Sequence, residues 1–411
     1  MKLGLDKPMV TNFFSLVSYQ GINFLLPLIA FPFLFRMLGD EYFGIYSFGW
    51  ALVQNLVMIT DFGFNLSATK YISMHKHDLG VVNRYVNSVF IARILLGIVC
   101  FLILLVLVTF VAKFKEHALF FLLFFGVIIG NIMSPMWFFQ GMEKMKYITL
   151  FNVTAKLLTF IPIFILIRGI QDYLWIPISF SGGYLLAGGV SLYIIYGKEK
   201  MKCFMPHFKE IREAIKDSST YFLSRVSVAL FTTVNVLVLG LVANYEMVSY
   251  YSRAEKFYQA YNLLLSPVTG VLFPHMAKTR DIPFYKRILF TISKWNIPLV
   301  ILIIIGSKLL LTTIYADSGE ETVLVFRILM CGCFITIPSM LLGYPFLAAL
   351  GHANYTNLTI IIVSIIHVIG VVLLYSFGFL SIYTMAIMVV LSEIILFLFR
   401  SNAVKKYKLF K

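Results

Sequence analysis

The stretch VNSVFIARILLGIVCFLILLVLVTFV, residues 86–111, is apolar along nearly its whole length and carries one charged side chain, Arg93. An α-helix crosses a hydrocarbon layer about 30 Å thick with roughly 20 apolar residues, because each residue advances the helix by about 1.5 Å. This stretch is therefore long enough to span a bilayer as one helix. It lacks the strict alternation of a lipid-facing barrel strand, which excludes an outer-membrane barrel.

The rest of the chain has the same character. Of its 411 residues, 60% are hydrophobic and only 13% are charged, whereas soluble domains are about one quarter charged. This composition excludes a soluble enzyme and a disordered chain. Twelve spanning helices would use about 240 residues, which is close to the apolar share of the chain. We therefore predict an all-α polytopic membrane protein.

Glycine, proline and charged residues divide the apolar runs into about twelve candidate spans. The eighth is the weakest, because charged and amide side chains lie near its start. The spans cover 11–35, 43–62, 86–111, 118–139, 147–167, 174–196, 218–241, 256–275, 288–312, 323–350, 357–376 and 380–399.

The formal net charge of +15 is explained by membrane topology. With twelve spans, both termini lie on one side. The segments on that side, including the tail from Arg400 onward, carry roughly three times as many Lys and Arg residues as the opposite loops. The positive-inside rule then predicts cytoplasmic termini. Nucleic acid is not needed to explain the charge, and we expect no nucleic-acid partner.

A polar segment divides the chain into two six-helix lobes, and short motifs recur in the same order in both. The N-terminal lobe is predicted at 1–197, the cytoplasmic linker at 198–217 and the C-terminal lobe at 218–411. Glu41 and Tyr46-Ser47 recur as Glu246 and Tyr251-Ser252, and Pro135 and Gly141 recur as Pro345 and Gly351. Six helices per lobe give a parallel internal repeat, with an axis along the membrane normal.

Five basic residues fall inside the candidate spans, where each costs roughly 3 kcal/mol at the bilayer centre. They are Arg93, Lys156, Arg225, Lys294 and Arg327. Four of them lie near span ends, where snorkelling to the headgroups and a place on a substrate pathway remain equally open. Lys156 lies near mid-depth, which favours a position facing a cavity. A cavity with surplus positive charge suits an anion, phosphate above all.

The spans hold two acids, Asp61 and Glu393. Asp61 lies near the end of the second span, where a cap or loop role and an ion-coupling role are both open. Glu393 could pair with a basic neighbour or titrate as a proton-coupling group. His367, near mid-depth in the eleventh span, is interpreted as a hydrogen-bonded packing residue.

The sequence offers no catalytic residues and no metal site. It contains no phosphate-binding glycine loop, no HExxH motif and no nucleophile elbow. The opposite loops are too short for an extramembrane active site. We therefore expect neither an enzyme nor a cofactor.

Several motifs resemble those of bacterial polysaccharide-biosynthesis flippases of the Wzx type, and the similarity runs over essentially the whole chain. These motifs are LFRMLG at 34–39, YFGIY at 42–46, DFGFNLSAT at 61–69, WFFQGMEKMKY at 137–147 and SRAEK at 252–256, which leads to SP at 266–267 and FP at 273–274. The family belongs to the multidrug/oligosaccharidyl-lipid/polysaccharide exporter superfamily.

The resemblance implies a transporter of the bacterial inner membrane that carries undecaprenyl-diphosphate-linked repeat units, for O-antigen or a similar surface polysaccharide, from the cytoplasmic to the periplasmic leaflet. It implies two lobes around a central, often cationic cavity, with alternating access and no cofactor. The substrate and the lipid bilayer are then its partners, with a polysaccharide polymerase and a chain-length regulator as candidates. Arg36, Asp61, Arg253 and Lys256 match the family motifs.

Three other readings remain open. A drug or cation antiporter of the same superfamily would need buried carboxylates, and the spans hold five bases and two acids. A membrane-embedded glycosyltransferase or polysaccharide polymerase would need acids or arginines on a large external loop. A scaffold of a polysaccharide-assembly complex would tolerate loss of Lys156.

Overall fold

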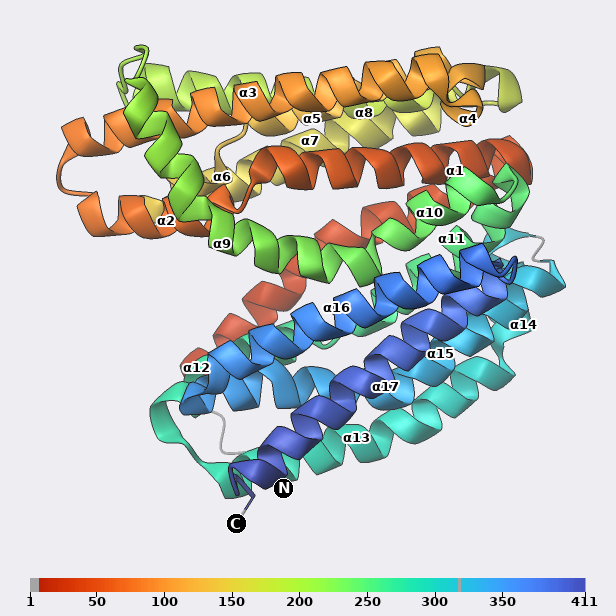
Figure 1. Ribbon diagram of the computed structural model, residues 1–411. Helices are drawn as coiled ribbons and strands as arrows, with labels where there is room; N and C mark the ends of the chain where they lie inside the picture. The colour runs from red at the N-terminus through yellow and green to blue at the C-terminus, as the bar shows by residue number, and fades with distance from the viewer. Residues whose placement is uncertain (1–6, 317–318, 411) are drawn as a thin grey trace. The chain divides into compact units, whose positions relative to one another are not determined.

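A computed structural model describes residues 7–316 and 319–410, and this part of the chain is helical almost throughout, with no β-strand (Figure 1). The predicted all-α class is confirmed, and the chain is a multi-pass membrane protein. The predicted cytoplasmic location of the termini stays a prediction, and the terminal residues 1–6 and 411 lie outside the described residues.

The twelve predicted spans lie in mainly helical segments, but several of them run across two consecutive helices and the break between them. In the described residues, eight helical stretches are long and apolar enough to cross a membrane, and a ninth is added if two helices bent by 52° form one span. Two stretches, Lys7–Asp61 and Glu320–Ser376, are 55 and 57 residues long, far more than one crossing needs. The count of twelve crossings stays a prediction.

The chain forms two compact units. One unit contains Met37–Ala229, and the other contains Met1–Arg36 together with Leu230–Lys411. Both boundaries fall inside helices, whereas the polar segment 198–217 lies wholly within the Met37–Ala229 unit. The internal repeat and the lobe boundaries stay predictions.

The Met37–Ala229 unit begins within α1 and ends within α9. Its elements are the second part of α1 (Lys7–Asp61), α2 (Phe64–His75), α3 (Leu79–Phe110), α4 (Ala112–Glu116), α5 (Ala118–Ile132), α6 (Met136–Gly141), α7 (Met145–Leu166), the 3₁₀ turn η1 (Ile170–Asp172), α8 (Trp175–Leu192), the π-helix η2 (Tyr193–Lys198) and most of α9 (Phe208–Thr232). Helices α3, α5, α8 and α7 lie side by side (Figure 1).

The second unit contains the first part of α1 and all the helices that follow α9. These are α10 (Val234–Val242), α11 (Tyr245–Leu263), α12 (Ser266–Thr279), α13 (Ile282–Ile305), α14 (Ser307–Tyr315), α15 (Glu320–Leu341), the π-helix η3 (Leu342–His352), α16 (Ala353–Ser376) and α17 (Ile382–Lys406). Helix α15 packs against α11, α13 and α17.

Local sequence sets several helix ends and breaks. The side chain of Asp78 accepts hydrogen bonds from the backbone N–H groups of Gly80 and Val81 and caps α3. Ser381 and Thr384 form a reciprocal capping box at the start of α17. Helix α1 is interrupted at Gly39, whose φ of 70° is left-handed, a conformation that costs glycine little.

Glycines let α5, α7 and α8 approach closely. A Cβ atom on Gly130 of α5 would overlap the backbone carbonyl of Tyr184 and lie 2.7 Å from the backbone nitrogen of Leu185 on α8. On the other side of α8, a Cβ on Gly183 would lie 2.8 Å from the carbonyl oxygen of Ala155 on α7. Small residues at such crossings allow the backbone contact that stabilises helix pairs in lipid, where no hydrophobic force drives association.

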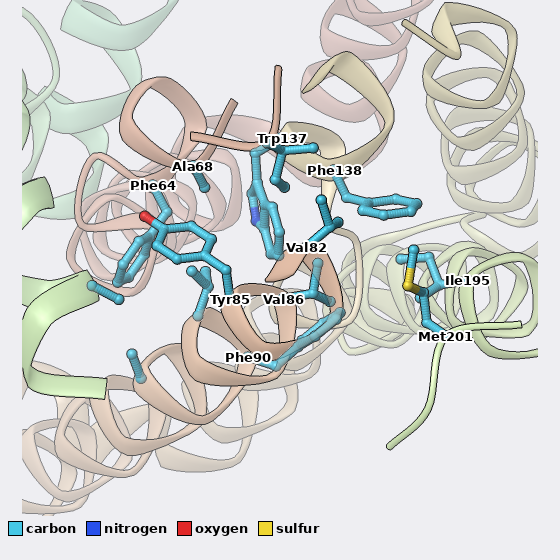
Figure 2. Close-up of a cluster of buried hydrophobic side chains, with 14 of the residues drawn as sticks. Phe64, Ala68, Val82, Tyr85, Val86, Phe90, Trp137, Phe138, Ile195 and Met201 are labelled. Atoms are coloured by element: carbon cyan, nitrogen blue, oxygen red, sulfur yellow. The ribbon is translucent and has the colours of Figure 1, made fainter. Parts of the chain in front are cut away.

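A buried apolar cluster holds the polar segment and the start of α9 against α2, α3 and α6 (Figure 2). Trp137 lies at its centre between side chains of α2 and α3, and Met201 from the polar segment lies beside Ile195 of η2. Ile211 and Ala214 of α9 belong to the same cluster. The start of α9 is therefore fixed on this unit.

The glycine packing predicts opposite effects of two alanine substitutions. Gly130→Ala is expected to destabilise the protein by about 1–3 kcal/mol, because the new methyl group overlaps the backbone of α8. Gly182→Ala, at a helical position with nothing within 4 Å, is expected to stabilise it by about 0.5–1 kcal/mol. Thermal unfolding of the purified protein in detergent checks both signs. Equal midpoints for the two variants would contradict the close packing of α5 on α8.

Candidate substrate-binding cations

Asp61 is the last residue of α1 and lies inside the Met37–Ala229 unit. The turn that follows contains Phe62 with φ of 41° and Gly63 with φ of 77°, which reverses the chain into α2. The carboxyl group of Asp61 is only 5% exposed, and its Oδ2 lies 3.5 Å from Nη1 of Arg225 on α9. Asp61 is therefore a buried ion-pair partner.

One face of α9 produces this pairing. Ser218, Phe222 and Arg225 follow the helical spacing of four and three residues. The Ser218 hydroxyl lies 2.6 Å from that of Ser67 in a hydrogen bond, and the Phe222 ring stacks on Phe62 with centroids 4.3 Å apart. These contacts align α9 with the turn so that the third residue of the face, Arg225, reaches Asp61.

Arg93 completes the group from α3. Its side chain is 1% exposed, and its Nη2 donates to Oδ1 of Asn131 at 2.7 Å. Longer hydrogen bonds of 3.4 Å reach the carbonyl oxygens of Thr60 and Ile132. Arg93 also interacts electrostatically with Asp61.

We call Asp61, Arg93 and Arg225 the Asp61 cluster. It contains two guanidinium groups and one carboxylate, so its net charge is about +1 when all three are ionised. Arg93 is enclosed, whereas the side chain of Arg225 is 45% exposed. The surplus positive charge is therefore accessible at Arg225.

In the other unit, two predicted arginines lie at opposite ends of α14. Nη2 of Arg36 donates to the carbonyl oxygens of Thr313 and Ile314, at 3.1 and 2.7 Å, where the negative end of the helix dipole lies. Nε of Arg327 donates to the Ser307 hydroxyl at 2.8 Å. Both arginines are exposed, and these acceptors are uncharged, so the positive charge is not cancelled by them.

Arg253 lies buried next to the Arg36 end of α14. The central carbon of its guanidinium group lies 3.9 Å from the ring centroid of Phe35, and 5.4 and 5.6 Å from those of Tyr250 and Tyr315. Aromatic faces attract a guanidinium ion through cation–π interactions. We call Arg36, Arg253 and Arg327 the α14 cluster.

The three predicted lysines lie outside both clusters. Lys156 is half-buried on α7, and Lys294 is exposed on α13. Lys256 is half-buried on α11, with its Nζ 5.0 Å from the ring centroid of Phe31. The substrate-binding role of all eight predicted cations stays a prediction.

Glu393 has a basic neighbour that the sequence placed in the C-terminal tail. Arg400 lies within α17, two turns after Glu393, and interacts with it electrostatically. The buried Arg400 donates through Nη1 to the carbonyl oxygen of Ser339 at 2.8 Å. The arginine and its packing were missed because the apolar run ends at 399, which put Arg400 outside the span.

His367 forms a buried polar group with two other side chains. Its Nδ1 lies 2.8 Å from the Ser392 hydroxyl and its Nε2 lies 3.0 Å from Oδ1 of Asn235. The interpretation of His367 as a hydrogen-bonded packing residue agrees with these contacts. In the described residues, no three His, Cys, Asp or Glu side chains could together hold a metal ion.

Comparison with known proteins decides the family. Residues 9–280 match the family of polysaccharide biosynthesis proteins. The chain belongs to this family. The resemblance predicted from the sequence motifs is thereby confirmed.

Two relatives and one solved structure are similar over most of the chain. A "Putative O-antigen transporter" of Shigella dysenteriae is 27% identical over 97% of this chain and 100% of the relative. A protein of the same description from Escherichia coli K12 is 27% identical over 77% of this chain and 78% of the relative. The lipid II flippase MurJ, in an inward closed conformation, superposes with a TM-score of 0.76 at 16% identity, over 94% of this chain and 87% of that one. This last likeness shows the fold.

The burial of Arg93 beside Asp61 predicts the effect of removing the carboxylate. Asp61→Asn leaves a guanidinium group in the interior without its opposite charge, which is expected to cost about 3–5 kcal/mol of stability. Arg225→Gln is the matched control from the same cluster. It removes an exposed partner and is expected to cost less than about 1 kcal/mol. Thermal unfolding in detergent measures both.

A second substitution separates this structural role from ion coupling. Adding Arg93→Gln to Asp61→Asn removes the buried charge and should restore part of the lost stability. If Asp61→Asn instead unfolds at the wild-type temperature yet abolishes transport, a coupling role for Asp61 is favoured over the structural one.

Proposed function

We propose that this protein is a flippase that moves undecaprenyl-diphosphate-linked oligosaccharide from the cytoplasmic to the periplasmic leaflet of the bacterial inner membrane. Membership of the polysaccharide biosynthesis family supports this proposal, as do relatives described as O-antigen transporters. The diphosphate carries about two negative charges, while the polyprenyl tail can stay in the lipid. Only the sugars and phosphates must then cross the apolar layer.

The accessible positive charge carried by membrane helices is the observation that carries the proposal. The side chain of Arg225 is 45% exposed although it pairs with the carboxylate of Asp61. Arg36 and Arg327 donate hydrogen bonds to uncharged oxygen atoms. Guanidinium groups bind phosphate oxygens through paired N–H donors. The presence of Arg225 and Arg327 inside apolar spans is costly, and it is explained if an anionic group binds them.

Lys156 provides the sharpest test, because its half-buried place on α7 makes snorkelling to the headgroups difficult. Lys156→Ala is expected to abolish surface polysaccharide at normal protein levels, and Lys156→Arg is expected to keep most of it, because the positive charge is retained. Lys146→Ala, which removes an exposed lysine from the first turn of the same helix, is the matched control and should have no effect.

The readout is the leaflet in which the lipid-linked repeat unit accumulates. A membrane-impermeant sugar-modifying reagent is applied to spheroplasts that lack the protein, with or without each variant. Protected units in the Lys156→Ala strain support the flippase. Accessible but unpolymerised units mean that translocation is intact, and they would reassign the protein to polymerisation or assembly.

The driving force can be tested in reconstituted vesicles. An inside-negative potential favours moving negative charge outward, by roughly 2.3 kcal/mol per charge per 100 mV. We expect a membrane potential without an ion gradient to support flipping. If flipping instead requires a proton or sodium gradient, coupling through Glu393 or Asp61 becomes the working mechanism, and Glu393→Gln should then remove the gradient dependence.

A further inference from the structure

The Met37–Ala229 unit carries an apolar groove whose lining residues include no charged side chain. Its volume is about 620 Å³, and it lies between one face of α3 and one face of α5, next to η2. The α3 side is formed by residues at helical spacing, and α5 contributes three more. The main lining residues are Phe90, Ile94, Ile98, Phe101, Ile129 and Ile132.

The groove has the length of one bilayer leaflet. From Phe90 to Phe101 the helix rises by about 16 Å, and half of the hydrocarbon thickness is about 15 Å. Gly97 forms part of the groove wall without a side chain. A Cβ atom at this position would lie only 2.7 Å from Cδ1 of Ile132 on α5, so glycine allows Ile132 to pack closely there. Ile94 and Ile98 are 45% and 52% exposed, so the groove opens toward lipid.

Two asparagines close one end of the groove with the polar segment. Nδ2 of Asn87 donates to the carbonyl oxygen of Lys202 at 2.9 Å, and the backbone N–H of Lys202 donates to Oδ1 of Asn83 at 3.1 Å. The backbone N–H of Phe204 donates to Oδ1 of Asn87 at 3.4 Å. These bonds hold Cys203 and Phe204 in place as the end wall.

Four exposed basic residues lie within three positions in the sequence of residues that line this closed end. We call Arg84, Lys198, Lys200 and Lys202 the basic collar; all four are exposed. The acid within the collar sequence, Glu199, forms an ion pair with Lys144, so it is already engaged. The groove is one leaflet long and apolar, which suits an acyl chain. The basic collar near its closed end suits an anionic lipid headgroup.

We propose that this groove binds one acyl chain of an anionic phospholipid, whose headgroup phosphate lies against the basic collar. The polyprenyl tail of the transported substrate is much longer than the groove, which favours the phospholipid. Binding here does not depend on translocation. Failure of the lipid site would leave the flippase proposal standing, and the reverse also holds.

The test counts lipids bound to the purified full-length protein by native mass spectrometry, with phosphatidylglycerol and phosphatidylcholine of identical acyl chains as probes. Ile94→Trp fills the groove and should abolish the retained phosphatidylglycerol. Leu95→Trp is the matched control, because Leu95 is the next residue of α3, is also 45% exposed and does not line the groove. Lys200→Gln with Lys202→Gln should lower phosphatidylglycerol affinity about 30-fold.

A labelling experiment places the lipid without relying on a substitution inside the groove. Cys203 is an exposed thiol in the end wall, and replacing the other exposed cysteine by Cys331→Ser leaves it as the accessible labelling site among the cysteines. A fluorophore on Cys203 should be quenched saturably by phosphatidylglycerol that carries a nitroxide near the headgroup end of an acyl chain. Equal quenching by the phosphatidylcholine analogue would overturn the proposal. Loss of the phosphatidylglycerol quenching when undecaprenyl phosphate is added would also overturn it, because the groove would then bind the polyprenyl chain instead.

Discussion

An ionised side chain within a hydrocarbon layer is stable only where hydrogen bonds, an opposite charge or water replace its hydration. Much of the arrangement within the Met37–Ala229 unit follows from meeting this requirement at Arg93. Asn131 and two backbone carbonyls take its N–H groups, and Asp61 supplies the opposite charge. Asp61 must therefore lie at the end of α1, beside a turn tight enough for α9 to pass over it. The serine pair and the stacked phenylalanines fix α9 there.

The same requirement is met differently around α14. Arg253 is surrounded by aromatic rings, whereas Arg36 and Arg327 use neutral oxygen atoms at the two ends of the helix. Enclosed guanidinium groups, here Arg93 and Arg253, stabilise the packing of their own unit. Exposed ones, such as Arg225, keep their positive charge accessible at the surface of their unit. Each unit thus combines an enclosed arginine with at least one accessible arginine, and substitutions at the two kinds of position should affect stability and transport to different degrees.

The positions of the helices could be predicted from the sequence because an apolar run of sufficient length has few alternatives in lipid. The family followed from local motifs such as DFGFNLSAT at 61–69. The partners of the charged residues could not be predicted, because they are set by packing between distant segments. Nothing in the sequence links Asp61 to Arg225, and the Arg36 contact with α14 joins residues 277 and 278 positions apart. The burial of Arg400 was not predicted, because a span defined by hydropathy ends where the apolar residues stop. The helix itself continues past that point and includes the buried arginine.

The chain passes between its two units twice, at Arg36–Met37 and at Ala229–Leu230, and neither passage is a loop. An intact helix resists bending, because each residue is tied to the one four positions before it. Both junctions nevertheless lie close to a break in the regular helical hydrogen bonding. These breaks are the left-handed Gly39 in α1 and the 52° bend between α9 and α10. The two connecting helices are therefore least stiff next to the junctions between the units, whereas the backbone on either side of each junction keeps its helical hydrogen bonds.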